Sequence, residues 1–382
     1  MREIVAITKC ESYEQSEVQK AISGVIEATD GLSFVKPGMK IGIKTNLISM
    51  MNPDRAGTTH PALLSELCRI LIDRGAKVIV GDSPGGMYTS GYVNNVYKGC
   101  GLEEVTVTGA KLNQDFSVKE ASFPEALSIK SFVYTGWLDS VDAIINFSKL
   151  KTHGMLGMTC AVKNMFGTIP GTTKPEYHMR FPEISAFANM MIDLNEYFKP
   201  SLYIVDAVEA MEGNGPTSGR PKHIGAVLAG KSPYDLDIAC AYLIGFDDKK
   251  DIQTLEEAYN RGLGPKDVHE VNVTDDLDKY KPESFEHVEQ QKSLEFIESN
   301  GFIGKAAVGI LHAAFKTEPR VNNAACIGCK KCYDVCPAHA ITMKNDKPQI
   351  DRKKCIHCFC CQEFCPKGAM KVHETLLARL MK

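Results

Sequence analysis

The chain has 382 residues, of which 44% are hydrophobic and 24% are charged, and its formal net charge is −3. These values are typical of a globular protein with a sizeable core, and the length favours one large domain plus a smaller module. The N-terminal stretch lacks the pattern of a secretory signal, and no apolar run reaches the roughly 18 residues that a membrane span needs. We therefore expect a cytoplasmic protein without a membrane span.

The charge is unevenly distributed along the chain. Between Arg320 and Lys382 there are 12 Lys and Arg against 5 Asp and Glu, a net of +7, which leaves −10 for the remainder. A basic segment can bind nucleic acid. Here the basic residues are not interleaved with the aromatic residues on which bases stack, so we expect no nucleic-acid partner.

Short β-rich runs alternate with helical patterns over roughly the first 250 residues. The patterns predict strands at 3–8, 39–47, 76–82, 142–147, 201–208 and 223–230, and helices at 16–29 and 60–75. Pro61 suits the first turn of the second helix and Gly75 suits its end. Such alternation is typical of the α/β class and predicts a mostly parallel sheet with helices on both faces.

The chain then changes character. Residues 247–298 are highly charged and weakly periodic, and we interpret them as peripheral elements, followed by a docking helix across about 293–315. The sequence thus predicts a large α/β domain over 1–315 and a small α+β domain over 316–382. The second segment is too small to bury much apolar area, so it needs a covalent or metal staple to fold.

The cysteines supply that staple. Of 14 cysteines, nine lie between Cys326 and Cys365. They form two runs of the spacing C-x2-C-x2-C-x3-C-P, in which three thiolates hold one iron–sulfur cluster and the fourth reaches the other. We therefore assign one 4Fe–4S cluster to Cys326, Cys329, Cys332 and Cys365, and a second to Cys355, Cys358, Cys361 and Cys336.

Alternatives to this assignment exist. CxxC pairs also bind zinc, but two overlapping triads do not divide naturally into tetrahedral sites. Cys360 stands outside the eight ligands, either as a thiol beside a cluster or as an alternative ligand to Cys358 or Cys361. The basic residues of the segment would offset the negative charge of the clusters. The segment resembles bacterial-type two-cluster ferredoxins across about 322–372, which implies a role in electron transfer.

Polar residues follow several predicted strands of the large domain. In an open parallel sheet, ligands gather where strands end, so these groups are candidates for one shared cleft. Lys44, Lys149, Lys151 and Lys163 would supply positive charge, Thr58, Thr59 and Ser83 hydroxyls, and Gly85 and Gly86 free N–H groups. This set predicts a ligand that carries phosphate or carboxylate.

Structural interpretations compete with that prediction. Thr59 could cap the helix that starts near Pro61, and Asp82–Gly85 could be only a turn. His60 and His153 could be hydrogen-bonded structural residues. The five cysteines outside the cluster segment lie in apolar contexts typical of core residues, with Cys160 a candidate for reactivity because Lys163 is near. We find no phosphate-binding loop, dinucleotide fingerprint or hydrolase elbow.

Three stretches of the large domain, KTNL–TTHP–GDSPGG, SKLKTHGMLGMTCAVKNMFGTIPG and VDAVEAMEGNGPTSG, resemble the DUF362 family. That family often carries a two-cluster ferredoxin segment, so the resemblance implies an iron–sulfur protein without assigning an activity to the large domain. The motif residues that the resemblance carries over as ligand-binding candidates are Lys44, Asn46, Thr59, His60, Asp82, Ser83, Lys151, His153, Lys163 and Asn164.

Three functions fit these observations. The clusters could exchange electrons with a large domain that binds, and reduces, an anionic small molecule. The chain could instead be a pure electron carrier whose large domain docks a partner oxidoreductase, with the charge asymmetry aiding recognition. Cluster storage or sensing is a third function. In each of the first two, electrons would arrive from a redox partner protein, because no flavin or nicotinamide motif is evident.

Overall fold

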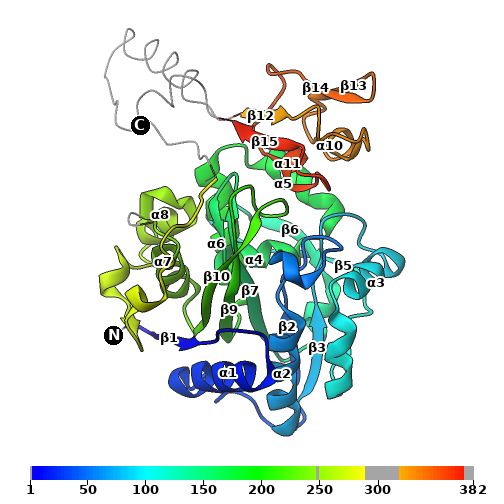
Figure 1. The fold of residues 1–382 in the computed structure, drawn as a ribbon. Coiled ribbons are helices and arrows are strands. Elements are labelled where there is room, and N and C mark those ends of the chain that lie inside the picture. Colours follow the sequence, from blue (N-terminus) through cyan, green and yellow to red (C-terminus); the bar gives the residue numbers. More distant parts are fainter. Residues whose placement is uncertain (1, 247–248, 289–317, 374–382) are drawn as a thin grey trace.

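A mixed β-sheet runs through the N-terminal part of the chain, which we call the large domain (Figure 1). The computed structural model describes residues 2–246, 249–288 and 318–373. Within them the sheet has nine strands, in the order β11-β1-β10-β9-β7-β2-β3-β4 with β8 beside β7. The strands are β1 (Ile4–Lys9), β2 (Lys40–Lys44), β3 (Lys77–Gly81), β4 (Lys111–Leu112), β7 (Ala143–His153), β8 (Gly157–Thr159), β9 (Leu202–Glu212), β10 (Arg220–Gly230) and β11 (Asn272–Val273).

The sheet is mostly parallel, as the sequence predicted. Strands β4, β3, β2, β7 and β9 run parallel to one another, whereas β10 is antiparallel to both β9 and β1. The parallel strands bring their carboxyl ends to one edge of the sheet, where a ligand site is expected. A separate hairpin, β5 (Val118–Ser122) and β6 (Ser131–Thr135), lies outside this sheet.

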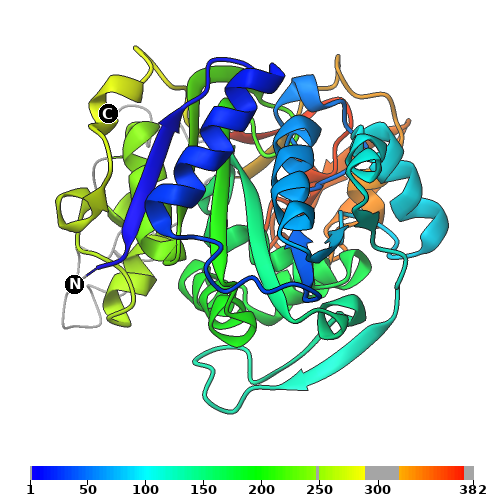
Figure 2. The ribbon, with the colours of Figure 1, turned by 90° about the horizontal axis from the view of Figure 1, so that it is seen from below.

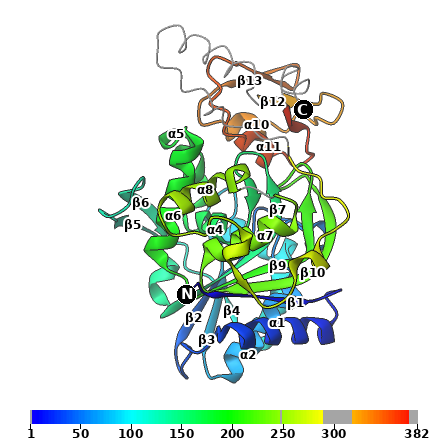
Figure 3. The same cartoon turned by 90° about the vertical axis from the view of Figure 1, so that its left-hand side faces the viewer.

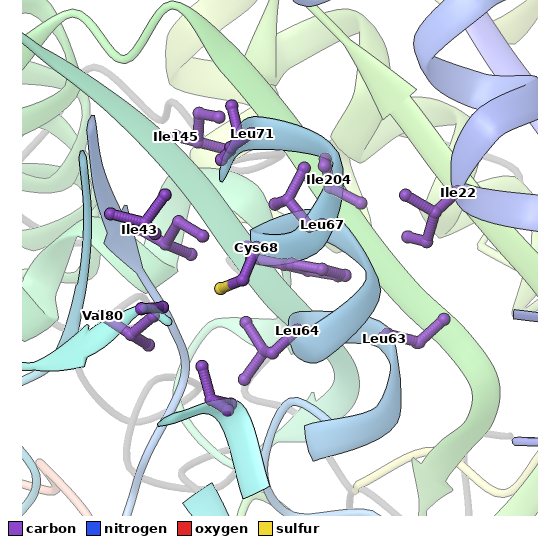
Figure 4. Close-up of a cluster of buried hydrophobic side chains, with 14 of the residues drawn as sticks. Ile22, Ile43, Leu63, Leu64, Leu67, Cys68, Leu71, Val80, Ile145 and Ile204 are labelled. Carbon is purple, nitrogen blue, oxygen red and sulfur yellow. The ribbon is translucent and has the colours of Figure 1, made fainter. Parts of the chain in front are cut away.

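Helices cover both faces of the sheet. They are α1 (Gln15–Thr29), α2 (Pro61–Asp73), α3 (Ser90–Gly99), α4 (Ala161–Asn164), α5 (Lys174–Arg180), α6 (Ile184–Phe198), α7 (Pro233–Leu243) and α8 (Gln253–Asn260). Figure 2 shows α1 and α2 side by side over one face. There, Leu63, Leu64 and Leu67 pack on strand residues that include Ile145 and Ile204 (Figure 4).

Successive strand residues point to opposite faces, so neighbours on β9 serve two cores. Ile204 belongs to the core under α1 and α2, whereas Val205 packs with Leu236 and Leu243 of α7. Burial on both faces explains why the strand reads as a continuous apolar run rather than an alternating one.

Strand boundaries differ from the prediction in one place that matters for function. The run at 142–147 was expected to end before the lysines, but β7 continues to His153. The extension is stabilised because β7 pairs with β8 on one side, where Lys151 lies opposite Thr159, and with β9 on the other. Lys149, Lys151 and His153 are therefore strand residues and not loop residues.

The C-terminal segment, residues 318–373, lies at one end of the large domain (Figure 3). It contains β12 (Glu318–Val321) paired with β15 (Met370–His373), β13 (Ile341–Lys344) paired with β14 (Lys347–Ile350), and the short helices α10 (Lys331–Asp334) and α11 (Cys360–Glu363). Its own apolar cluster is small and consists of the buried residues Cys332, Ile341, Cys361 and Met370 with a few partly buried neighbours. So small a core fits the expectation that the segment needs a staple. The predicted helix at 293–315 lies outside the described residues.

Candidate functional site

A cavity of about 630 Å³ lies where the large domain meets the C-terminal segment. We call it the large cavity. Its large-domain wall comes from the loops that follow β2 and β3, from Lys151 on β7, and from α4 and α5. Its other wall comes from the C-terminal segment and includes Cys360, Glu363 and Phe364. A cavity of this volume holds a small organic molecule.

A buried ion pair stabilises the part of the large cavity's wall that follows β2 and β3. Lys44 Nζ lies 2.6 Å from Asp82 Oδ1, and both side chains are almost fully buried. Asp82 also accepts hydrogen bonds from the backbone N–H groups of Leu47 and Ser83 at 2.6 and 2.8 Å. The pair therefore ties together the two loops that line the large cavity.

Two asparagines hold Lys151 in position. Lys151 Nζ donates to Asn46 Oδ1 at 2.6 Å and to the Gly57 carbonyl at 2.8 Å. Asn46 Nδ2 donates in turn to Asn164 Oδ1 at 2.8 Å, and Asn164 Nδ2 donates to Asn146 Oδ1 at 2.6 Å. A protonated ammonium has three N–H bonds, so one remains for a ligand in the cavity.

Three lysines of the cavity wall, Lys151, Lys163 and Lys174, have no carboxylate within ion-pair distance in the part of the chain that the structure describes. Burial lowers the pKa of Lys151 to about 7 and that of Lys174 to about 8, and it also lowers the pKa of Lys163. These shifts arise because the charged forms are desolvated without sufficient compensation. A bound anion would supply that compensation.

Two buried polar atoms of the wall have no hydrogen-bond partner among the described residues. They are Nδ1 of His178 and Oγ1 of Thr159, and each residue is 3% exposed. The imidazole of His178 stacks on Phe187 with ring centroids 4.3 Å apart, which fixes its plane. Buried polar atoms are normally hydrogen-bonded, so their position on the wall suits a polar ligand.

The C-terminal segment closes the cavity through specific polar contacts. His153 Nε2 lies 2.5 Å from Glu363 Oε1. Gln362 Nε2 donates to Asn214 Oδ1 at 2.9 Å and to the Gly215 carbonyl at 2.8 Å. These contacts join residues about 150 to 210 positions apart, so the site exists only when the two parts dock.

Two smaller cavities in the C-terminal segment are each lined by four cysteines. The first quartet is Cys326, Cys329, Cys332 and Cys365, and the second quartet is Cys336, Cys355, Cys358 and Cys361. Each quartet takes three cysteines from one motif and one from the other, which is the division made from the sequence. The backbone N–H groups of Ala340 and Ala369 donate to the sulfurs of Cys336 and Cys365 at 3.2 Å. Sulfur-only donors with N–H···S bonds fit iron–sulfur clusters.

Six of the ten candidate residues of the large domain line the large cavity, and Lys44 lies behind them. The six are Asn46, Asp82, Ser83, Lys151, Lys163 and Asn164. The other three lie elsewhere. Thr59 Oγ1 donates to the Phe147 carbonyl, His60 stacks on Tyr13, and His153 binds the C-terminal segment. His60, and not Thr59, caps α2, because its Nδ1 accepts from Ala62 N–H at 3.2 Å.

Two other expectations for this region were wrong. Lys149 does not line the large cavity, because its fully buried ammonium forms an ion pair with Asp206 at 2.8 Å and also donates to the partly buried Tyr13. The N–H of Gly85 donates to the Ile48 carbonyl at 2.9 Å, so it is not free for an anion. The structural interpretation of Cys160 agrees with its position, since burial raises the pKa of its thiol well above the usual value.

Sequence reasoning missed several residues of the wall. Lys174 and His178 both lie on α5, which starts at a Lys-Pro pair that is typical of a first helical turn. That signal predicts a helix but gives no sign of a cavity. Glu363 and Phe364 lie between two predicted cluster ligands, Cys361 and Cys365. The pattern there indicates cluster binding and gives no sign that the residues between the cysteines line a second cavity.

Comparisons with known proteins support this description. A family model described as "Domain of unknown function (DUF362)" matches residues 41–242, and one described as "4Fe-4S dicluster domain" matches residues 325–369. The thylakoid-associated protein sll1697 of Synechocystis sp. is 28% identical over 268 residues, which cover 68% of this chain and 80% of that protein.

Among solved structures, the lactate racemase apoprotein of Thermoanaerobacterium thermosaccharolyticum matches with a TM-score of 0.42 and 12% identity. The match covers 65% of this chain and 58% of that one. No helix among the described residues is long and apolar enough to cross a membrane. The cytoplasmic location stays a prediction.

Proposed function

The chain belongs to the DUF362 family and carries a 4Fe–4S dicluster domain, and from that premise we propose that it is an oxidoreductase that reduces an anionic small molecule in the large cavity. One observation carries this proposal. Cys365 and Pro366 line both the large cavity and the cavity of the first quartet. A molecule in the large cavity would therefore lie against a ligand of the first cluster.

We assign the two quartets to two 4Fe–4S clusters. Each cluster, when bound, accepts and donates one electron at a potential set by burial and by hydrogen bonds to its sulfurs. The N–H groups of Ala340 and Ala369 are such hydrogen bonds, one for the ligand that each motif contributes to the other motif's quartet. The interlocked cysteines would hold both clusters within the one segment.

Residues of the large domain would bind the substrate and move its protons. Lys163 and Lys174 supply charge for a phosphate or carboxylate group, and His178 Nδ1 and Thr159 Oγ1 supply polar contacts. Lys151, oriented by Asn46 and the Gly57 carbonyl, holds a proton at Nζ with a pKa of about 7. A group with that pKa donates a proton efficiently near neutral pH.

The electrons that reduce the substrate must come from a donor outside this chain. A two-electron reduction of the bound molecule consumes two electrons, which a reduced redox partner protein supplies singly, and two protons, one from Lys151 and one from solvent. Docking of the C-terminal segment covers part of the cavity, and less water around the buried Lys151 strengthens its attraction to an anion.

The experiment that tests the proposal starts from anaerobic purification of the full chain. Native mass spectrometry should detect a retained anionic molecule, and reduced methyl viologen should then drive its turnover. Lys163→Met should lower retention and turnover by at least about tenfold, because a charge-assisted hydrogen bond contributes about 1.5–3 kcal/mol. Lys119→Met is the matched control, since Lys119 is 48% exposed and pairs with Asp139 outside the cavity.

Two outcomes would contradict the proposal. If the protein retains no molecule, shows no turnover and passes electrons only to a partner enzyme, it is a pure electron carrier. Rapid loss of clusters to apo-acceptor proteins would instead support storage or sensing.

The proposal also predicts a pH dependence of anion binding. An anion binds best to protonated lysines, and the pKa values of Lys151 and Lys174 in the free site are about 7 and about 8. Binding raises both values, so affinity should be constant below about pH 7 and fall as the pH rises, by up to about tenfold per unit for each lysine. Calorimetric titration with sulfate as the probe, because its charge does not change from pH 6 to pH 9, should show this fall, and an affinity that rises with pH would contradict it.

A further inference from the structure

The second quartet reaches the surface beside an exposed basic run. Arg352, Lys353 and Lys354 are exposed and directly precede Cys355, whose thiol lines the second cavity. Arg352 pairs with Glu318 at 3.1 Å. Within the described residues, neither Lys353 nor Lys354 has an ion-pair partner for its ammonium group. Two uncompensated charges therefore lie in solvent next to a proposed cluster ligand.

The whole C-terminal segment has the same sign. Over residues 318–373 there are 10 Lys and Arg against 5 Asp and Glu. The large domain is acidic overall, so the positive field of the molecule is concentrated around the quartets. Such a field steers a negatively charged protein toward the segment and raises its association rate.

The two quartets have different neighbours. Only the first quartet shares a residue, Cys365, with the large cavity, and no ligand of the second quartet lines it. The cavity of the second quartet is lined by Phe359, which is buried against the large domain, and by partly exposed residues that include Pro337 and Ala338. The first quartet thus has one side toward the large cavity, and the second quartet has one side toward solvent beside Lys353 and Lys354.

We propose that the face formed by Lys353 and Lys354 binds an acidic one-electron carrier protein, which delivers its electron at the second quartet for transfer to the first. The carrier is oxidised by one electron and the chain is reduced by one at each encounter, with no bond formed or broken. This inference rests on the assignment of the quartets to clusters. It does not require that a substrate is reduced in the large cavity.

The first quartet has an exposed face of its own, which is the competing docking site. Cys329 is exposed, Ile327 is 60% exposed, and Lys330 and Lys367 border the quartet. If the electron entered on that face, it would reach the large cavity through the first quartet without passing through the second. The two faces offer a matched comparison, because each presents two exposed lysines on the same segment.

The test measures cluster reduction in the anaerobic full chain by stopped flow, from the loss of visible absorbance, with a reduced acidic ferredoxin as the probe. Lys353→Glu with Lys354→Glu should slow reduction by about 10- to 100-fold at low ionic strength, and the difference should shrink at about 0.5 M salt. Lys330→Glu with Lys367→Glu carries the same charge change on the competing face and should slow it by less than about threefold. Lys36→Glu with Lys77→Glu, on exposed residues of the large domain, controls for net charge.

A change in cluster potential could also slow reduction, so each variant is reduced by methyl viologen radical, a small cation that needs no docking. That rate should not fall in any variant. Equal slowing by both pairs on the segment, slowing only on the first-quartet face, or no effect of Lys353→Glu with Lys354→Glu would overturn the proposal. Failure of substrate turnover with normal ferredoxin kinetics would count against the proposed reductase alone.

Discussion

Replacing Cys365 with alanine should remove about half of the iron from the anaerobically purified protein, although the residue belongs to the second cysteine motif. Cys365 lines the first quartet with Cys326, Cys329 and Cys332. Loss of one of four thiolate ligands opens that site, whereas the second quartet keeps all of its sulfurs. Iron and sulfide analysis of the variant, with electron paramagnetic resonance of the reduced protein, measures the result.

Two neighbouring cysteines provide the controls for this prediction. Cys336→Ala should remove the other half of the iron, because Cys336 belongs to the second quartet despite its place in the first motif. Cys360→Ala should leave the iron content unchanged, since Cys360 lines the large cavity and neither quartet. Loss of iron from Cys360→Ala with none from Cys365→Ala would contradict the assignment.

The quartets illustrate what the sequence determines directly. Spacing within a motif is a local property, and in two-cluster ferredoxins the fourth cysteine of each motif binds the other cluster, so the division of the cysteines could be predicted from the sequence. The alternation of strands and helices was also readable, because apolar periodicity reflects burial on one or two faces. The strand predicted at 76–82 is β3 (Lys77–Gly81), and the helix predicted at 60–75 is α2 (Pro61–Asp73).

The lysines of β7 show what could not be predicted from the sequence. Lys149 and Lys151 are two residues apart and looked equivalent, yet one pairs with Asp206 and the other lines the large cavity. The register between β7 and β9 shifts between them, so Lys149 lies opposite Asp206 whereas Lys151 lies opposite Met211. An irregularity of this kind depends on the partner strand and leaves no local signal in the chain.

The second wall of the large cavity was unpredictable for another reason. Glu363 and Phe364 enter the site only because the C-terminal segment docks on His153 and on the loop around Asn214. The contacts join surfaces that are distant in sequence. Each surface is polar, so from the sequence alone we would expect it to be exposed to solvent. Only the assembled fold shows that the C-terminal segment and the lysine-lined cleft share one cavity.

The Lys149–Asp206 pair should be among the most costly to break in the large domain. Both side chains are fully buried, and Asp206 also accepts from the backbone N–H of His60 at 3.0 Å and from Tyr13 Oη at 3.1 Å. Asp206→Ala leaves a buried ammonium without its counter-charge, so we expect a loss of about 3–5 kcal/mol in the free energy of unfolding. Urea denaturation of the anaerobic protein, followed by circular dichroism, measures it.

The same loss should depend on pH in a defined direction. Burial lowers the pKa of Lys149 from its ordinary value of 10.5, and Asp206 opposes that shift. Without Asp206 the pKa falls further, so the folded variant binds fewer protons than the unfolded chain below about pH 10.5, and its stability rises with pH toward that value. The deficit relative to the unmodified protein should therefore shrink as the pH increases.

Two comparisons distinguish a buried charge from a general loss of packing. Lys119→Ala breaks an exposed pair with Asp139 and should cost less than about 1 kcal/mol. Lys149→Met combined with Asp206→Leu removes both charges and should recover much of the stability lost in Asp206→Ala, because two apolar side chains leave no unpaired ion. A double variant as unstable as Asp206→Ala, at every pH, would mean that the hydrogen bonds of Asp206 to Tyr13 and His60, and not its charge, stabilise this region.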